Sequence, residues 1–222
     1  SAKCELFYHI EEERLVVIKT SNSSDTELIE REKNNFENIS HPFIPIFYGT
    51  MKDGQRTSLV IEYINGQTFD NIKNMKLEED CMFKIIFDLC SIFQYLHKNE
   101  YIYRDLKPDN VILDKNNQIV LIDFDRMIQE TDINDQDITR DLGSDFAAPE
   151  IKSGGTPSYK SDIYSLGKMI VFIIGGNENK NKILLLKHHI FQTYIDEKPE
   201  NRPSVLNLIE SFSRALYNLG VI

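Results

Sequence analysis

Residues 103–110 have the sequence YRDLKPDN, and the polar residues in and around this stretch decide how the whole chain is interpreted. The stretch follows a segment with helical spacing of apolar residues and precedes a predicted β-hairpin. It contains Asp105, Lys107 and Asn110, while Asp123 stands at the end of the second hairpin strand. Because a hairpin returns the chain to where it began, we expect Asp123 to lie close to this stretch.

These side chains predict a site for a metal ion and a phosphate. Carboxylate and amide oxygens suit Mg²⁺, a hard ion that usually shares its coordination with a phosphate group. Asp and Asn are also common in turns, and that alternative would account for Asp109 and Asn110. It does not account for Asp123, which comes directly after the apolar run 119–122.

The composition is that of an ordinary globular protein. Of 222 residues, 41% are hydrophobic and 27% are charged, which excludes a mainly disordered chain. The chain has 25 basic and 35 acidic residues, and the formal net charge of −10 argues against a broad nucleic-acid surface or an anionic membrane as partner. Three cysteines without a CxxC pair disfavour a disulfide scaffold or a zinc site.

The cysteine pattern also predicts a reducing compartment, and we therefore expect a cytoplasmic protein. The longest apolar run, 169–174, is far too short to span a bilayer, and the start of the chain does not have the pattern of a signal segment. Since the first residue is Ser1 rather than methionine, we expect the sequence to be a piece of a longer one.

Apolar periodicity predicts strands in the first part of the chain and mostly helices in the rest. The expected strands are 6–10, 15–20, 44–51, 57–64, 111–113 and 119–122. Of these, 44–51 and 57–64 are expected to form a hairpin around Asp53-Gly54. The expected helices are one that begins near Ser24, with capping-box spacing to Glu27, and others over 82–96, over 161–174 and from about Pro203. Residues 123–151 and 177–181 show no period and are interpreted as loops, the first of them functional.

One charged residue stands on the apolar side of the first predicted helix. Glu32 lies four residues after Leu28 and four before Phe36. An ionised carboxylate there is costly without a partner, and Lys19, at the end of an apolar strand, could supply the charge. The alternative is a partly exposed Glu32 at the edge of the apolar stripe, and the spacing alone favours that alternative.

Four motifs occur in one order along the chain. The stretch VVIK at 16–19 corresponds to the motif VAIK, and YRDLKPDN at 103–110 corresponds to HRDLxxxN. Further along, DFD at 123–125 corresponds to DFG, and APE at 148–150 matches APE itself. With this ordered set the chain resembles the eukaryotic-type protein kinases over essentially its whole length. The Lys-Pro pair at 107–108 is more similar to serine/threonine kinases than to tyrosine kinases.

The resemblance implies an α+β, bilobal protein kinase-like fold and a single domain over residues 1–222. A small β-rich N-lobe with one helix would occupy 1–64, and a larger, mostly helical C-lobe would occupy 65–222. The glycine-rich loop GxGxxGxV of the family is not found before Lys19, and the N-lobe is therefore expected to lack that loop and the first strand.

The resemblance also implies roles for single residues in a reaction that uses ATP and Mg²⁺. Asp105 would orient the substrate hydroxyl and accept its proton, and Lys107 would offset charge on the transferred phosphoryl group. The Lys19–Glu32 pair is thereby favoured over the exposed Glu32, and it would orient Lys19 onto the ATP phosphates. Asn110 and Asp123 would hold Mg²⁺.

The adenine site and the supporting residues follow from the same resemblance. Val17 and Ile112 would enclose the base, Ile61 would be the gatekeeper, and the backbone from Glu62 to Ile64 would form the hinge. The residues expected to support the fold are Phe36, Phe47, Tyr103 and Phe124 as an aromatic spine, Glu150 with Arg202 as an ion pair, and Asp162 in a central helix.

The chain departs from the family pattern at several places. Asp125 replaces the glycine of DFG, where it could restrict Phe124 or attract a second cation. Thr139 and Ser144, and less strongly Thr131, are candidates for phosphorylation, since a phosphate could pair with Arg104. The stretch from 150 to 202 is also shorter than usual, and its His188-His189 pair is interpreted as surface.

The function implied is a serine/threonine protein kinase that transfers the γ-phosphoryl group of ATP to a protein substrate. The alternative is a catalytically impaired kinase fold that acts as a scaffold through protein binding. A small-molecule phosphotransferase fits less well, because such enzymes usually lack the APE motif and its paired Arg202. The oligomeric state is left open.

Overall fold

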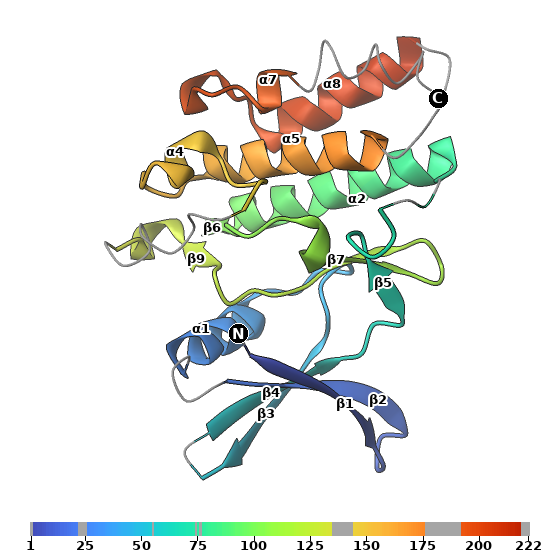
Figure 1. The fold of residues 1–222 in the computed structure, drawn as a ribbon, viewed down its shortest axis with the longest axis vertical. Coiled ribbons are helices and arrows are strands. Elements are labelled where there is room, and N and C mark those ends of the chain that lie inside the picture. The colour runs from blue at the N-terminus through green and yellow to red at the C-terminus, as the bar shows by residue number, and fades with distance from the viewer. Residues whose placement is uncertain are drawn as a thin grey trace.

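The computed structural model describes residues 2–21, 26–54, 56–73, 75, 77–134, 144–175 and 192–218. It has a small lobe built on a β-sheet and a larger helical lobe, joined by the chain around β5 (Figure 1). The elements of the small lobe are β1 (Lys3–His9), β2 (Arg14–Thr20), α1 (Thr26–Asn38), β3 (Phe47–Asp53) and β4 (Arg56–Glu62). The bilobal α+β fold expected from the sequence is confirmed.

The sheet of the small lobe is antiparallel, with the strand order β1-β2-β4-β3. Lys19 pairs in register with Leu59, and Val17 pairs with Ile61, so β2 lies between two partners. Since side chains two residues apart on a strand point to the same face, Val17 and Lys19 share one face of the sheet. The strand predicted over 15–20 is thus confirmed as β2, and the first predicted hairpin, over 44–51 and 57–64, is confirmed as β3 and β4.

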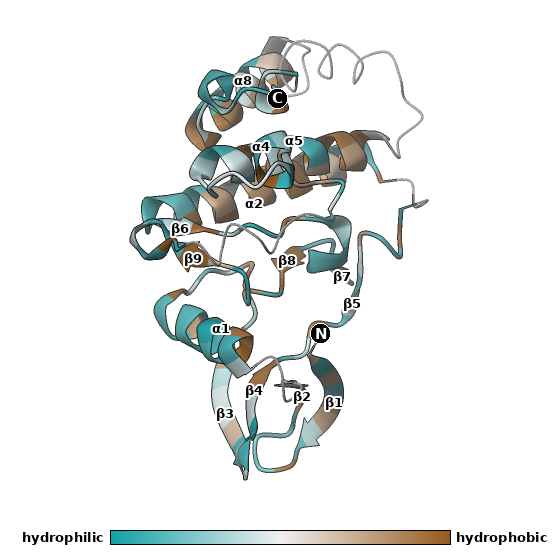
Figure 2. Ribbon diagram, turned by 60° about the vertical axis from the view of Figure 1, so that its left-hand side comes forward, coloured by the Kyte–Doolittle hydropathy of each residue, from teal (hydrophilic) through white to brown (hydrophobic). Residues whose placement is uncertain are grey.

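The larger lobe is assembled around two long helices, α2 (Glu79–Lys98) and α5 (Tyr159–Gly175). The apolar period that predicted α2 is confirmed, because Met82, Ile85, Ile86 and Leu89 are all fully buried. Burial of each such side chain contributes about 1.5–3 kcal/mol. Apolar residues follow α5 for most of its length, whereas α1 is largely hydrophilic (Figure 2).

The remaining helical elements complete the larger lobe. They are α4 (Pro149–Lys152), α7 (Gln192–Tyr194), α8 (Val205–Asn218) and the short turns η1 (Pro108–Asn110), η2 (Glu130–Asp132) and η4 (Pro199–Asn201). The final helix begins close to Pro203, as expected. No helix among the described residues is both long enough and apolar enough to cross a membrane.

Short strands lie between the two lobes, and the stretch 103–110 runs between two of them, β6 (Tyr101–Ile102) and β7 (Val111–Asp114). One sheet has the order β5-β7-β8, from β5 (Gly66–Thr68), β7 and β8 (Ile119–Leu121). The hairpin of β7 and β8 confirms the second predicted hairpin, and its turn is held by Asp114, whose Oδ1 accepts the N–H groups of Asn116 and Gln118. The hairpin thus returns the chain to the stretch that precedes it.

The expectation of a structureless loop over 123–151 is wrong in part. The segment contains β9 (Ile128–Gln129), which pairs with β6 (Tyr101–Ile102), as well as η2 and α4. Two-residue strands and single helical turns are too short to show a period in the sequence. Ser24, Thr139, the loop 177–181 and the His188-His189 pair lie outside the described residues.

Candidate active site

Lys19 is the centre of the site between the lobes. Its Nζ lies 2.7 Å from Oδ1 of Asp123 and 2.8 and 2.7 Å from the two carboxylate oxygens of Glu32. The side chain is only 10% exposed. Burial alone would lower the pKa of Lys19, but the charges of Glu32 and Asp123 outweigh it and the pKa is raised. Lys19 therefore stays charged and bridges α1 to the chain after β8.

Glu32 is almost fully buried, and the sequence alternative of an exposed residue at the edge of the stripe is wrong. Its Oε1 also accepts the N–H of Phe124 at 3.1 Å. Burial raises the pKa of Glu32 to about 7, although Lys19 acts in the opposite direction. A buried pair of this kind is costly to break, by roughly 3–5 kcal/mol, because one charge is left without compensation.

The stretch 103–110 forms its own hydrogen-bonded cluster. Asn110 donates from Nδ2 to the backbone oxygen of Asp105 at 2.8 Å and to its Oδ2 at 2.9 Å. Lys107 donates from Nζ to the same Oδ2 at 2.7 Å. Asp105 and Asn110 are buried, and the three residues assigned to this stretch are therefore held as one rigid group.

An aromatic column supports the site from below, as the sequence resemblance suggested. Phe36 stacks on Phe47 with centroids 5.6 Å apart and meets Phe124 edge-on at 5.2 Å. Tyr103 packs against Phe124 at 5.6 Å and donates from its hydroxyl to the carbonyl of Ile122 at 2.6 Å. The column runs from the small lobe into the larger one and fixes the position of the chain that follows Asp123.

A cavity of 380 Å³ opens beside Lys19 and has the size of small-molecule sites. Its lining contains every residue that the resemblance assigned to binding of the nucleotide, namely Lys19 for the phosphates and Val17, Ile61, Glu62, Ile64 and Ile112 for the base. Tyr63, within the predicted hinge, also lines the cavity, and its apolar part is completed by Ala2, Cys4, Pro45 and Ile122. The other end of the cavity is charged, with Asp123 and Asp125 near Lys19.

The donor set at the charged end fits a magnesium ion bound together with a phosphate. Asp123 offers a carboxylate at this end of the cavity. Asn110 is not among the lining residues, but its backbone carbonyl accepts the N–H of Ile122 at 2.9 Å, next to Asp123. The side-chain Nδ2 of Asn110 is engaged with Asp105, which leaves the amide oxygen as the atom it could offer to a metal. Among the described residues, no three His, Cys, Asp or Glu side chains gather into a complete metal site. Magnesium is usually held by one or two carboxylates and completed by phosphates and water, so this sparse set matches its preference.

Asp125 lies at the charged end of the same cavity. Burial raises the pKa of Asp125, and the charge of Asp123 raises it further. The backbone at Asp125 does not have the positive φ angle that would require glycine, whereas Asp123 has a φ of 68°. The replacement of the family's glycine is thus accommodated without strain at that residue.

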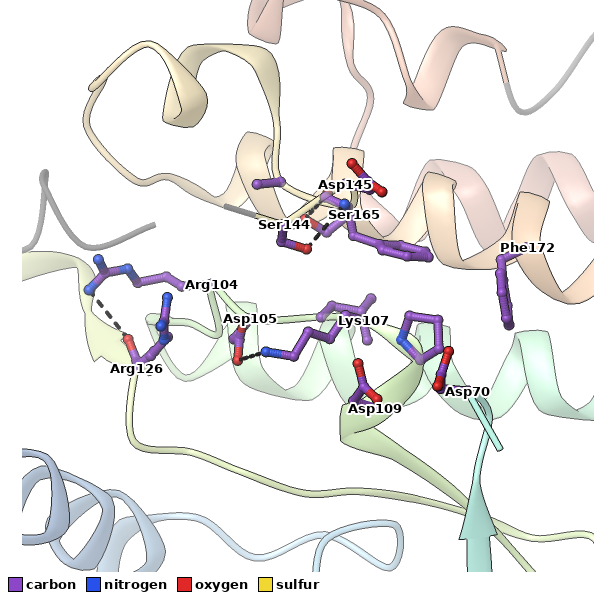
Figure 3. Close-up of a pocket in the computed structure, with 14 residues that line it drawn as sticks. Asp70, Arg104, Asp105, Lys107, Asp109, Arg126, Ser144, Asp145, Ser165 and Phe172 are labelled. Carbon is purple, nitrogen blue, oxygen red and sulfur yellow. Dashed lines mark hydrogen bonds and ion pairs between the residues drawn. The ribbon is translucent and has the colours of Figure 1, made fainter. Parts of the chain in front are cut away.

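A second cavity, of 530 Å³, is lined by Asp105 and Lys107, which do not line the first one (Figure 3). Arg104 and Arg126 lie at one end of it, and Asp70 and Asp109 lie at the other. Asp105 and Lys107 face the opening between these ends. A polypeptide segment in this cavity could bring a hydroxyl group to Asp105 without entering the first cavity.

Ser144, a candidate for phosphorylation, lines this second cavity together with Arg104. The Oγ of Ser144 accepts the N–H of Phe146 at 3.2 Å. Thr131, the weaker candidate, is exposed in η2. Ser144 and Arg104 therefore line the same cavity, and phosphorylation of Ser144 stays a prediction.

Asp162 of α5 holds the start of the stretch 103–110. Its carboxylate accepts the N–H groups of Tyr103 at 2.8 Å and of Arg104 at 2.9 Å, and it lies 3.0 Å from Nε2 of His97. Arg104 has a φ of 74°, a strained conformation that these bonds support. The residue expected to be structural from the sequence therefore anchors the backbone next to Asp105.

Asn35 is a site residue that the sequence reasoning missed. It is buried on α1, one turn after Glu32, and donates to the backbone beyond Asp123. The signal available in the sequence was a single polar residue directly before Phe36 on a helix whose exposed face also carries asparagines. Such a residue is not distinguishable from surface by its spacing alone.

Comparison with known proteins gives a consistent result. The family model described as "Protein kinase domain" matches residues 1–217. "Dual specificity protein kinase zak2" of Dictyostelium discoideum is 30% identical over 198 residues, which cover 84% of this chain and 30% of that protein. "Protein kinase C zeta type" of Oryctolagus cuniculus is 29% identical over 195 residues, 84% of this chain and 33% of that protein.

A bacterial relative extends the comparison. "Serine/threonine-protein kinase PknB" of Mycolicibacterium smegmatis is 30% identical over 155 residues, 66% of this chain and 25% of that protein. The chain thus spans about a third or less of the length of these relatives. The similarity therefore concerns the domain described above and not the remaining parts of those proteins.

Proposed function

Since this chain belongs to the protein kinase family, we propose that it transfers the γ-phosphoryl group of ATP to serine and threonine hydroxyls of a protein substrate. The nucleotide would occupy the cavity beside Lys19, with its base between Val17 and Ile112 and against the backbone from Glu62 to Ile64. The protein substrate would approach through the second cavity.

The chain's own residues have distinct roles in this proposal. Asp105 would hold the substrate hydroxyl and accept its proton, and Lys107 would offset charge on the phosphoryl group in transfer. Lys19, fixed by Glu32, would position the phosphates. Asn110 and Asp123 would hold magnesium, which when bound neutralises charge on the phosphates.

One observation carries the proposal. Lys19 bridges Glu32 on α1 and Asp123 after β8, so three residues far apart in the sequence meet within hydrogen-bond distance at the cavity. Protein kinases need the ion pair of this lysine with the helix glutamate for catalysis, and they need the aspartate that follows the strand to hold magnesium. A chain selected only for its fold has no evident need to keep a buried Lys–Glu pair against the part-exposed Asp123, since buried ion pairs do not stabilise a fold efficiently.

The test is transfer of labelled phosphate from MgATP to a generic basic protein. Asp105→Asn should abolish transfer, and Asp53→Asn, at the exposed end of β3, should leave it unchanged. Phosphoamino-acid analysis of the product identifies the acceptor, and phosphotyrosine beside phosphoserine would replace the serine/threonine assignment with dual specificity. Transfer that persists in Asp105→Asn would overturn the assigned role.

A second candidate is a kinase fold that binds proteins without catalysis. The observation that favours it is Asp125, which adds a carboxylate next to Asp123 in the nucleotide cavity. This candidate predicts weak binding of MgATP. A rise of the melting temperature with MgATP that is lost in Lys19→Ala would count against it, because a ligand of the native state must stabilise that state.

A further inference from the structure

Helix α1 turns two buried polar side chains towards the chain that follows Asp123. Glu32 and Asn35 are three residues apart on the helix and therefore lie on one face. Glu32 accepts the N–H of Phe124 through Oε1 at 3.1 Å. Asn35 donates through Nδ2 to the carbonyl of Phe124 at 2.7 Å and to the carbonyl of Met127 at 2.9 Å.

The two carbonyls that Asn35 binds are the ends of a tight turn. The N–H of Met127 donates to the carbonyl of Phe124 at 3.3 Å, and the side chains of both residues are fully buried. A buried carbonyl that loses its hydrogen bond costs folding free energy. Both protons of the Asn35 amide are therefore engaged by residues 124–127, which accounts for a polar residue inside the apolar face of α1.

The residue before this turn has a strained backbone. Asp123 has a φ of 68°, in the left-handed region that non-glycine residues rarely adopt. Such a conformation persists only where the surroundings determine it. Here the next peptide units are held on both sides, because Glu32 binds the N–H of Phe124 and Asn35 binds its carbonyl.

From this geometry we infer that Asn35 is a positioning residue that holds residues 124–127 against α1 and so keeps Asp123 directed at Lys19. Asn35 does not line the cavity of Lys19 and acts only through the backbone. Its two bonds make the position of α1 and the conformation of Asp123 depend on each other. This link is separate from the Lys19–Glu32 pair, since it does not involve a charged group.

The direct test replaces Asn35 with leucine, which has a similar volume and cannot donate a hydrogen bond. In Asn35→Leu, amide hydrogen exchange at Phe124 and Met127 should become faster by on the order of tenfold, while exchange in α2 stays unchanged. The KM for MgATP should rise more than the KM for the protein substrate, because Asp123 faces the nucleotide cavity. The exchange measurement does not depend on phosphate transfer, so it can fail or succeed separately from the proposed function.

Matched variants complete the test. Asn34→Leu makes the same change on the exposed side of α1 and should leave exchange and both KM values unchanged. Asn35→Gln keeps an amide donor and should restore part of the protection. Unchanged exchange at Phe124 and Met127 in Asn35→Leu would overturn the inference, as would equal acceleration in Asn34→Leu.

A measurement on the unchanged protein covers the case in which Asn35→Leu does not fold. The side-chain amide protons of Asn35 should exchange with solvent much more slowly than those of the exposed Asn34, by on the order of tenfold or more. If the two side-chain amides exchange at the same rate, Asn35 does not hold residues 124–127 and the inference is wrong.

Discussion

At the scale of single residues, the balance of charge around Lys19 governs the site. One ammonium group is shared by two carboxylates, those of Glu32 and Asp123. The cluster therefore has one negative charge too many while Glu32 is ionised, and burial makes that state costly. A proton on Glu32 removes the excess but weakens the bond that fixes Lys19.

This balance predicts a dependence on pH. The pKa of Glu32 is about 7 in the folded chain, against an ordinary value of 4.5. The folded state therefore binds this proton more readily, and between these two values the contribution of Glu32 to stability falls as the pH rises. Activity should respond in the opposite sense, because ionised Glu32 is the form that fixes Lys19. We expect kcat/KM for MgATP to fall as the pH drops through about 7.

The measurement is a pH profile of kcat/KM for MgATP, which reports groups of the free enzyme. Glu32→Gln should have lower activity throughout and should lack the acidic limb near pH 7. An acidic limb that persists unchanged in Glu32→Gln would assign it to another group and contradict the prediction.

At the scale of elements, α5 determines the backbone next to Asp105. The carboxylate of Asp162 accepts the N–H groups of Tyr103 and Arg104, and the positive φ of Arg104 depends on this support. Helix α5 of the larger lobe thus sets the backbone conformation of Arg104, which lines the second cavity beside Asp105. The link passes through two backbone amides and not through a side chain of the stretch itself.

Asp162→Asn tests this link. The side-chain amide of the new asparagine would point its NH₂ group at one of the N–H groups of Tyr103 and Arg104 that the carboxylate now accepts. Because that N–H group loses its acceptor, the free energy of unfolding should fall by roughly 1–3 kcal/mol. Denaturant unfolding measures this change, and faster amide exchange at Arg104 should accompany it. Asp53→Asn serves as the matched control, and an equal loss of stability there would show that the effect is not specific to α5.

Sequence reasoning succeeded for elements with a long period and failed for short ones. The apolar spacing of α2 and the two hairpins predicted their structures, because many side chains repeat one signal. The strands β6 and β9 have two residues each, and only their mutual pairing defines them. The spacing marked Glu32 as a charged residue on an apolar stripe, but only the resemblance to the family made the buried pair with Lys19 the preferred interpretation. The neutral Asn35 had neither signal.

At the scale of the whole molecule, the larger lobe is tied together by Arg202. Its side chain is fully buried, and its Nη1 and Nη2 atoms bind the two oxygens of Glu150 at 2.6 and 2.8 Å. The remaining donors bind the carbonyls of Lys160, Asp196 and Glu197. One side chain therefore joins α4, α5 and the chain before η4.

Arg202→Lys should destabilise the protein strongly. Lysine has three donors and cannot form the paired bonds to Glu150, so at least two of the five part-buried hydrogen bonds of Arg202 are lost. We expect the free energy of unfolding to fall by roughly 3–5 kcal/mol, measured by chemical denaturation. Arg214→Lys, in the last helix, is the comparison and should change stability little. A small effect of Arg202→Lys would mean that water replaces the missing donors.

The outermost strand of the small lobe has a consequence for handling the protein. All seven residues of β1 are exposed, among them Leu6, Phe7 and Tyr8, and within the part of the chain that the structure describes β1 pairs only with β2. An exposed edge strand with apolar side chains and unpaired backbone groups can pair with strands of other molecules. Concentrated solutions of this polypeptide should therefore tend to aggregate along that edge, and a lysine at an outward position of β1 is the natural remedy.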